Sequence, residues 1–180
     1  MIDLQLGDDH APYGTGYCLA MADHPDELRV KPDHKLALKE RDPSATPGVD
    51  PGKRQAVEAA SIELNLRLEA LQEQLWAQGK HRIMIVLQAM DAGGKDGTIS
   101  KVFEHLNPSG VRVASFKAPS DNELAHDYLW RIHEQVPADG EMVIFNRSHY
   151  EDVLVVRVMD LAPEERWRKR YRHIREFEAM

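Results

Sequence analysis

The loop AMDAGGKDGT at residues 89–98 is the feature that most constrains how this chain can fold. It resembles the phosphate-loop pattern GxxxxGK[ST], but Ala89 replaces the first glycine and Asp96 replaces the final hydroxyl. An apolar run of strand length precedes the loop at 82–88, and a helix-spaced apolar pattern follows it from Ile99. A glycine-rich turn between a strand and a helix directs free backbone N–H groups at one point. The sequence therefore predicts an anion-binding loop.

The charged residues of this loop indicate what kind of anion it binds. Lys95 adds a positive charge, whereas Asp91 and Asp96 would repel a phosphate unless a divalent cation lay between them. They predict Mg²⁺, with Asp91 as the candidate ligand. In the alternative interpretation, the glycines serve backbone geometry, Lys95 is a surface residue and Asp96 caps the helix. The candidate phosphate-binding residues are Gly93, Gly94, Lys95, Asp96, Gly97 and Thr98.

Two more strand candidates, at 111–116 and 141–145, alternate with helical patterns. Strand, helix, strand, helix, strand is the order of an α/β fold with a parallel sheet and right-handed crossovers. A last helix is expected to begin near Pro163. Ligands bind open parallel sheets at the carboxyl ends of the strands, so the loops there are the candidate site.

Several local signals predict the other helices. An Asp-Pro pair at 50–51 begins a long amphipathic helix that ends at Gly79. Ser120, three residues before Glu123, forms a capping box for a helix behind it. The segment at 152–158 is ambiguous from its residues alone, because β-branched side chains favour a strand.

Length and composition limit the remaining possibilities. With 180 residues, 42% of them hydrophobic, we expect one domain at 53–180 and an extended or partly disordered arm at 1–52. The single cysteine, Cys18, excludes an internal disulfide and fits a cytoplasmic protein. The net charge of -7 argues against nucleic acid as a partner, and no stretch is apolar enough to predict a membrane contact.

A second candidate site is the segment IFNRSHYED, which follows the third strand candidate. Dense polar residues at the end of an apolar strand often mark a site, but a helix cap followed by a solvated turn would give the same pattern. Lys117 and Arg131 either add positive charge at the same edge or are ordinary surface charges. The polar candidates in the segment are Asn146, Arg147, Ser148, His149, Tyr150 and Glu151.

Taken together, these segments resemble the polyphosphate kinase type 2 family, from LRVKP at Leu28 to the end of the chain. The other matching pieces are VLQAMDAGGKDGTI at Val86, NPSGVRVASFKAPS at Asn107, HDYLWRIHEQVP at His126 and IFNRSHYEDVLVVRV at Ile144. The resemblance implies a thymidylate-kinase-like P-loop fold with three α/β/α layers and a helix from Tyr150 onward. Asp96 is typical of the family, whereas many relatives have glycine at the position of Ala89.

The resemblance implies reversible, Mg²⁺-dependent transfer of a terminal phosphate from inorganic polyphosphate to AMP or ADP. The residue at Glu151 resembles the subgroup that uses both nucleotides. The catalytic residues implied are Asp91, Lys95 and Arg147. The residues implied for phosphate binding, besides those of the loop, are Lys117 and Arg131. The residues implied for nucleotide binding are Asn146, Ser148, Tyr150 and Glu151.

The resemblance also implies a homo-oligomer and further helices beyond the position of Met180, including a basic lid. A chain without a lid would exclude water poorly from its active site. Two alternatives therefore stay open. One is an ATP-dependent nucleotide or small-molecule kinase on the same fold, and the other is a fragment that binds polyphosphate or nucleotide without turnover.

Overall fold

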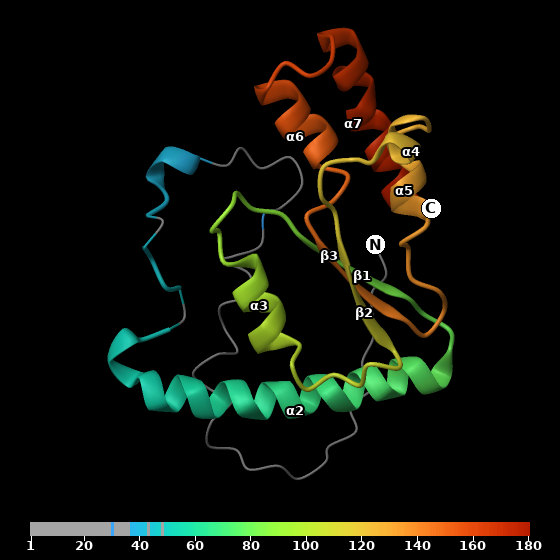
Figure 1. Ribbon diagram of the computed structural model, residues 1–180. Coiled ribbons are helices and arrows are strands. Elements are labelled where there is room, and N and C mark those ends of the chain that lie inside the picture. Colours follow the sequence, from blue (N-terminus) through green and yellow to red (C-terminus); the bar gives the residue numbers. More distant parts are fainter. Residues whose placement is uncertain (1–29, 31–36, 43, 48) are drawn as a thin grey trace. The chain divides into compact units, whose positions relative to one another are not determined.

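The structure, a computed structural model, describes residues 30, 37–42, 44–47 and 49–180 (Figure 1). The chain divides into two compact units, Met1–Glu63 and Leu64–Met180, and the candidate site lies in the second. In the first unit two short 3₁₀ helices are described, η2 (Leu38–Glu40) and η3 (Pro51–Lys53). Most of the expected arm lies outside the described residues, so its boundary stays a prediction.

The predicted long helix is α2 (Arg54–Gln78), which η3 directly precedes. The Asp50 side chain accepts a hydrogen bond from the Gly52 N–H at 2.9 Å, as expected of a capping aspartate. Gly79 follows the helix with a φ of 57°, a left-handed conformation that glycine adopts without strain. Among the described residues, none of the helices combines the length and apolar character needed to span a bilayer.

A parallel three-stranded sheet forms the centre of the second unit, as predicted. Its strands are β1 (Ile83–Leu87), β2 (Val111–Ser115) and β3 (Met142–Asn146), in the spatial order β1-β3-β2 (Figure 1). In the register of the sheet, Leu87 and Ser115 both lie opposite Asn146. All three strands therefore end at the same level.

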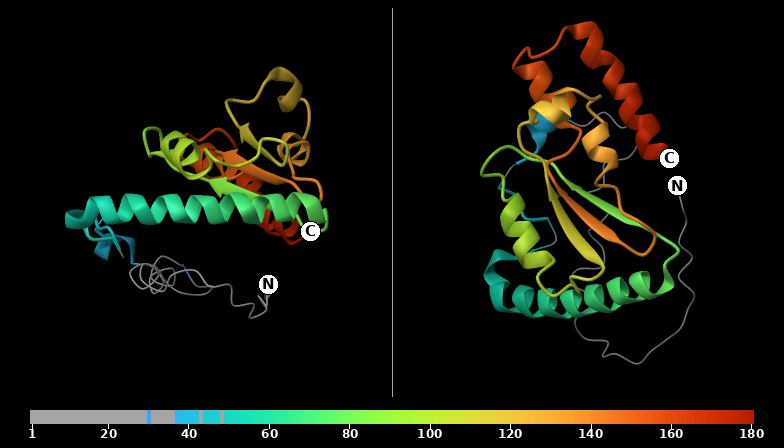
Figure 2. Two further views of the ribbon diagram at one scale, coloured as in Figure 1. Left: turned by 90° about the horizontal axis from the view of Figure 1, so that it is seen from below. Right: turned by 45° about the vertical axis from the view of Figure 1, so that its right-hand side comes forward.

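Helices flank this sheet, which confirms the α/β fold. The chain runs from β1 past β3 to β2 through α3 (Lys95–Val102), and returns to β3 through α5 (Trp130–His133). Since right-handed crossovers that run in opposite directions lie on opposite faces, α3 and α5 cover different faces of the sheet. Two more helices, α6 (Glu151–Val158) and α7 (Glu164–Ala179), follow β3, and α6 lies beyond the carboxyl ends of the strands (Figure 2). The ambiguous segment at 152–158 is thus helical.

The helix predicted behind the capping box is in fact two short helices, α4 (Asp121–Leu124) and α5. The box itself is present, with the side chains of Ser120 and Glu123 each bonded to the other's backbone N–H. The bond from the Ser120 N–H lowers the pKa of Glu123. The interruption follows at Asp127, whose carboxylate accepts a bond from the Leu129 N–H at 2.9 Å. Such local bonds compete with helix formation, and the sequence pattern did not reveal this one.

The hydrophobic core lies between the sheet and helices α5 and α7. Val143 and Phe145 of β3 and Ile132 of α5 are fully buried there, and Phe177 of α7, which is also buried, belongs to the same cluster. Because strand side chains alternate, Ile144 points to the other face, where it is also buried. The central strand is therefore covered on both faces, which fixes the level at which its polar end emerges.

We expect Gly110→Ala to lower the free energy of unfolding by about 1–3 kcal/mol, because the site has no room for a methyl group. A Cβ at Gly110 would lie 3.2 Å from Trp76 Cβ and would collide with the buried amide of Gln72. Urea unfolding measures the loss. The control is Gly97→Ala in α3, where a Cβ meets nothing within 4 Å and should stabilise the helix by about 0.5–1 kcal/mol. Equal stabilities of the two variants would contradict this packing.

Candidate functional site

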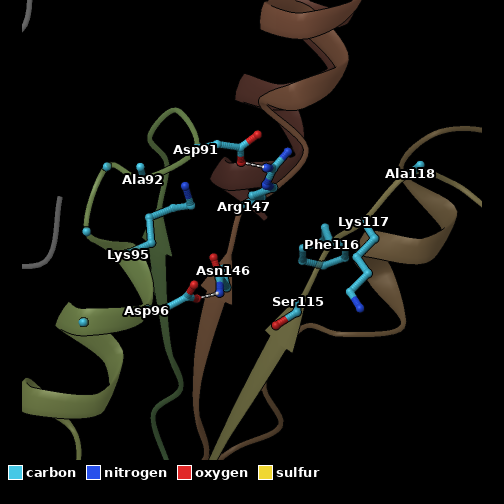
Figure 3. A pocket seen from close by; sticks show the side chains of 13 residues that line it. Asp91, Ala92, Lys95, Asp96, Ser115, Phe116, Lys117, Ala118, Asn146 and Arg147 are labelled. Carbon is cyan, nitrogen blue, oxygen red and sulfur yellow. Dashed lines mark hydrogen bonds and ion pairs between the residues drawn. The ribbon is translucent and has the colours of Figure 1, made fainter.

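A cavity of about 650 Å³ lies at the carboxyl ends of the three strands (Figure 3). The phosphate loop after β1 forms one wall, and the segments that follow β2 and β3 form the others. The lining residues are 91–97, 115–118, 146 and 147. The structure thus brings together, at one edge of the sheet, the two polar segments that the sequence singled out.

The phosphate loop has the backbone geometry of a tight turn. Gly94 precedes α3 with a φ of 81°, which favours glycine. A Cβ at Gly93 would lie 2.8 Å from the Ala89 methyl and 2.9 Å from the Met90 carbonyl oxygen, so only glycine fits there. Lys95 closes the turn, because its Nζ donates to the carbonyl oxygens of Ala89 and Met90, each at 2.8 Å. The lysine is therefore held at the cavity by its own loop.

Two polar contacts connect this loop to the end of β3. The Asn146 amide donates to Asp96 Oδ1 at 2.6 Å, and Arg147 forms an ion pair with Asp91 (Figure 3). Arg147 has a φ of 64°, an uncommon value for a residue with a side chain, and it brings the guanidinium over the loop. Both ends of the loop are thus fixed by residues of the second candidate segment.

The loop carboxylates offer a limited set of oxygen ligands for a cation. Within the part of the chain that the structure describes, no three His, Cys, Asp or Glu side chains gather as a metal site. The Asp91 side chain is 87% exposed, and Asp96 uses one of its oxygens on Asn146. Mg²⁺ typically takes one or two carboxylates together with water and substrate phosphates, so these residues fit Mg²⁺ bound with a phosphorylated substrate.

A second, larger cavity of about 1030 Å³ adjoins the first and extends toward α6 and α7. We call it the α6–α7 groove. Its lining includes Tyr128 from the segment between α4 and α5, Glu151 from α6 and His173 from α7. Arg147 lines both this groove and the strand-end cavity. The two hollows therefore meet at Arg147 and at the segment 116–118, which also lines both.

Arg131, a candidate phosphate ligand, is largely buried at the wall of this groove. Its guanidinium donates to the Lys117 carbonyl oxygen at 2.9 Å and lies 3.8 Å from Glu123 and 3.9 Å from Asp152. Arg170 also pairs with Asp152, at 3.0 Å. Burial raises the pKa of Asp152, although both guanidinium groups act to lower it. Arg131 thus supports the backbone at Lys117, whose own side chain lines both cavities.

Three predicted ligands do not line either cavity. The Ser148 side chain is fully buried and donates to Gln88 Oε1 at 3.0 Å. The Tyr150 hydroxyl donates to Glu178 Oε1 at 2.6 Å, and the Thr98 hydroxyl donates to the Gly94 carbonyl oxygen at 3.1 Å. These contacts are structural, and the assignment of the three residues as ligands stays a prediction.

Other residues at the site were missed by the sequence interpretation. Ser115, Phe116 and Ala118 line the strand-end cavity beside Lys117. They directly follow or end β2, so the rule that ligands bind at carboxyl strand ends would have found them. Gln88 was also missed. It stands between β1 and the loop, and only its partners along the chain, Ser148 and Glu151, reveal its importance.

With this geometry in view, comparison with known proteins decides the family. The family described as Polyphosphate kinase 2 (PPK2) matches residues 52–180 of the chain. The chain belongs to the polyphosphate kinase 2 family. A solved member, polyphosphate kinase 2 from Arthrobacter aurescens TC1, is similar to it with a TM-score of 0.79 and 42% sequence identity. That similarity covers 88% of this chain and 57% of the solved one.

Curated members of the polyphosphate kinase 2 family differ in the acceptor that they are named for. The AMP/ADP-polyphosphate phosphotransferase of Meiothermus ruber is 64% identical over 86% of this chain and 57% of its own length. The ADP-polyphosphate phosphotransferase of Rhodopseudomonas palustris is 46% identical over 62% of this chain and 43% of its own length. The chain thus spans about half the length of these relatives.

We expect Tyr150→Phe to lower the free energy of unfolding by about 0.5–1.5 kcal/mol, since it removes the bond to Glu178. Burial and this bond raise the pKa of Tyr150 to about 12, whereas an unfolded tyrosine ionises near pH 10. Between these values only the unfolded chain loses the proton, so stability falls as the pH rises, and it should fall less in the variant. Urea unfolding from pH 8 to pH 12 measures both effects. Weaker nucleotide binding by a stably folded variant would instead support the assignment of Tyr150 as a ligand.

Proposed function

We propose that this protein transfers the terminal phosphate of inorganic polyphosphate to AMP and ADP, in a reversible reaction. The observation that carries the proposal is that the strand-end cavity and the α6–α7 groove meet at Arg147. Two anionic substrates can then approach one guanidinium from two sides. The names of the Meiothermus ruber and Rhodopseudomonas palustris relatives support polyphosphate as donor and a nucleotide as acceptor.

The residues of the strand-end cavity suit the donor end of this reaction. Lys95 and the free N–H groups at the start of α3 would hold the transferring phosphate. Arg147 would stabilise the negative charge that spreads over the phosphate oxygens in the transition state. The Mg²⁺ that we propose would be held through Asp91, and would neutralise part of the charge on the phosphate chain.

The α6–α7 groove suits the nucleotide acceptor. It combines apolar and aromatic surface, where a base and ribose can pack, with charged groups that orient them. Glu151 lies at the inner end, where its Oε2 is 3.9 Å from Arg147 Nη1. An acceptor phosphate is already ionised at neutral pH, so positioning and charge stabilisation suffice, and no covalent intermediate with the protein is needed.

The direct test supplies the protein with polyphosphate, Mg²⁺ and either AMP or ADP, and measures ADP or ATP by chromatography. We expect both acceptors to be phosphorylated. A parallel reaction replaces polyphosphate with ATP. If ATP with another acceptor gives the faster reaction, the protein is an ATP-dependent nucleotide or small-molecule kinase. Binding of both ligands without product would indicate a polyphosphate- and nucleotide-binding role instead.

We expect Lys95→Ala to reduce phosphate transfer at least about a hundredfold, because it removes the only side-chain cation of the phosphate loop. Among the residues that the structure describes, the half-buried Lys95 side chain bonds to its own loop alone, so the folded state should persist. Lys101→Ala, at an exposed position of α3, is the matched control and should keep wild-type activity. Initial rates and circular dichroism are compared for the three proteins. Wild-type rates in Lys95→Ala would remove the basis for placing phosphate at this loop.

We expect Glu151→Asn to shift the ratio of kcat/KM for AMP over ADP toward ADP by roughly tenfold, a difference of about 1.4 kcal/mol. Asparagine is shorter and neutral, so it would lose the carboxylate that faces Arg147 in the groove. The ratio is measured with both acceptors at saturating polyphosphate. The control is Glu165→Asn on α7, an exposed carboxylate that pairs with Lys169 and lines neither cavity. An unchanged ratio in Glu151→Asn would show that Glu151 does not determine the preference between AMP and ADP.

A further inference from the structure

Gln88, between β1 and the phosphate loop, uses both ends of its side-chain amide. Its Nε2 donates to Glu151 Oε1 at 2.6 Å, and its Oε1 accepts from the Ser148 hydroxyl at 3.0 Å. Gln88 is half-buried, Ser148 is fully buried and the Glu151 side chain is 17% exposed. Bonds shielded from water in this way are electrostatically stronger than bonds at an open surface, and a network of them holds its members in place. The amide thus connects the first strand end to the segment that follows the third.

These bonds lie beside Arg147. The Oε2 of Glu151, left free by Gln88, lies 3.9 Å from Arg147 Nη1, and the same guanidinium pairs with Asp91 in the phosphate loop. The Arg147 backbone is held too, because its N–H donates to the Leu87 carbonyl oxygen at 3.1 Å. A left-handed backbone with a side chain persists only where its surroundings hold it. Leu87 therefore holds the backbone N–H of Arg147, and Gln88 contacts two of the residues that follow it, Ser148 and Glu151.

We propose that Gln88 is a positioning residue, which orients the Glu151 carboxylate and, through it, sets the guanidinium of Arg147 between the two cavities. The catalytic part of this inference rests on the proposed function. The amide is suited to the task because it donates to a carboxylate and accepts from a hydroxyl at the same time. A glutamate at this position can accept from Ser148 but cannot donate to Glu151 while it is ionised.

The test is Gln88→Glu, which sets two carboxylates against each other at nearly unchanged volume. At pH 8 the repulsion should displace the Glu151 carboxylate and loosen the Arg147 guanidinium. We expect kcat to fall roughly tenfold, because Arg147 would then stabilise the transition state less well. At pH 6 the pair can share one proton, and the bond forms again. We expect the activity of the variant, relative to wild type at each pH, to recover at least threefold. The other charged neighbours of Glu151, Arg147 and Asp152, are the same in both proteins.

The second variant reverses the direction of the bond. In Gln88→Glu combined with Glu151→Gln, the new amide donates to the new carboxylate, and Ser148 still donates to residue 88. We therefore expect Gln88→Glu to cost less than threefold in kcat in the Glu151→Gln background, against tenfold in wild type. A purely volumetric or folding effect at position 88 would be equal in both backgrounds. Gln74→Glu, on the exposed surface of α2, controls for the added charge.

Urea unfolding of the same variants without substrate separates this inference from the proposed function. Gln88→Glu should be less stable at pH 8 than at pH 6 relative to wild type, and the double variant should regain the loss. If the wild type does not phosphorylate AMP or ADP, the proposed function fails, but the unfolding data still test the contact. Equal losses in both backgrounds, or a wild-type pH profile for Gln88→Glu, would overturn the positioning role.

Discussion

The parallel pairing of β3 with both of its neighbours is the constraint on which the site depends. The register sets Leu87, Asn146 and Ser115 side by side, so three loops begin at one level. Burial of Val143 and Phe145 against α5 and α7 fixes this strand more firmly than any contact in the loops does. A slip of one residue would turn Asn146 away from the phosphate loop and exchange the side chains that β3 presents to its two covered faces. Hydrophobic packing therefore determines where the polar groups meet.

A small number of polar contacts between protein groups fixes the geometry of the site. Lys95 bonds to its own loop, Arg147 bonds to Asp91, and Gln88 connects the loop's entry to Glu151. Lys95 and Arg147 thus have protein partners before any ligand is present, which limits the rearrangement that binding requires. The pairs at the mouth are exposed enough to exchange a protein partner for a ligand, as the 87% exposure of the Asp91 side chain indicates. The Ser148 side chain is fully buried, so its bond to Gln88 is not accessible to a ligand and stays in place.

Much of this arrangement could be predicted from the sequence, because its signals are local. Strand length, the capping box at Ser120 and the glycine stop at Gly79 depend on neighbouring residues, and all three were confirmed. The break at Asp127 was missed, although it is local, because an Asx bond looks like any polar residue in a helical pattern. Gln88 was missed for a different reason. Its two partners are 60 and 63 positions away, and no spacing rule connects them.

Asn146, the hydrogen-bond partner of Asp96, explains how a carboxylate can replace the usual hydroxyl in the phosphate loop. A carboxylate there faces the end of β3, where another carboxylate would repel it unless a cation lay between them. Asn146 instead supplies a neutral amide that donates to Asp96 at 2.6 Å. The second oxygen of Asp96 takes no part in this bond and stays available at the cavity wall. The phosphate loop therefore contributes a carboxylate to this contact, and the end of β3 contributes a neutral amide. The contact thus carries a single negative charge at the start of α3, next to Lys95.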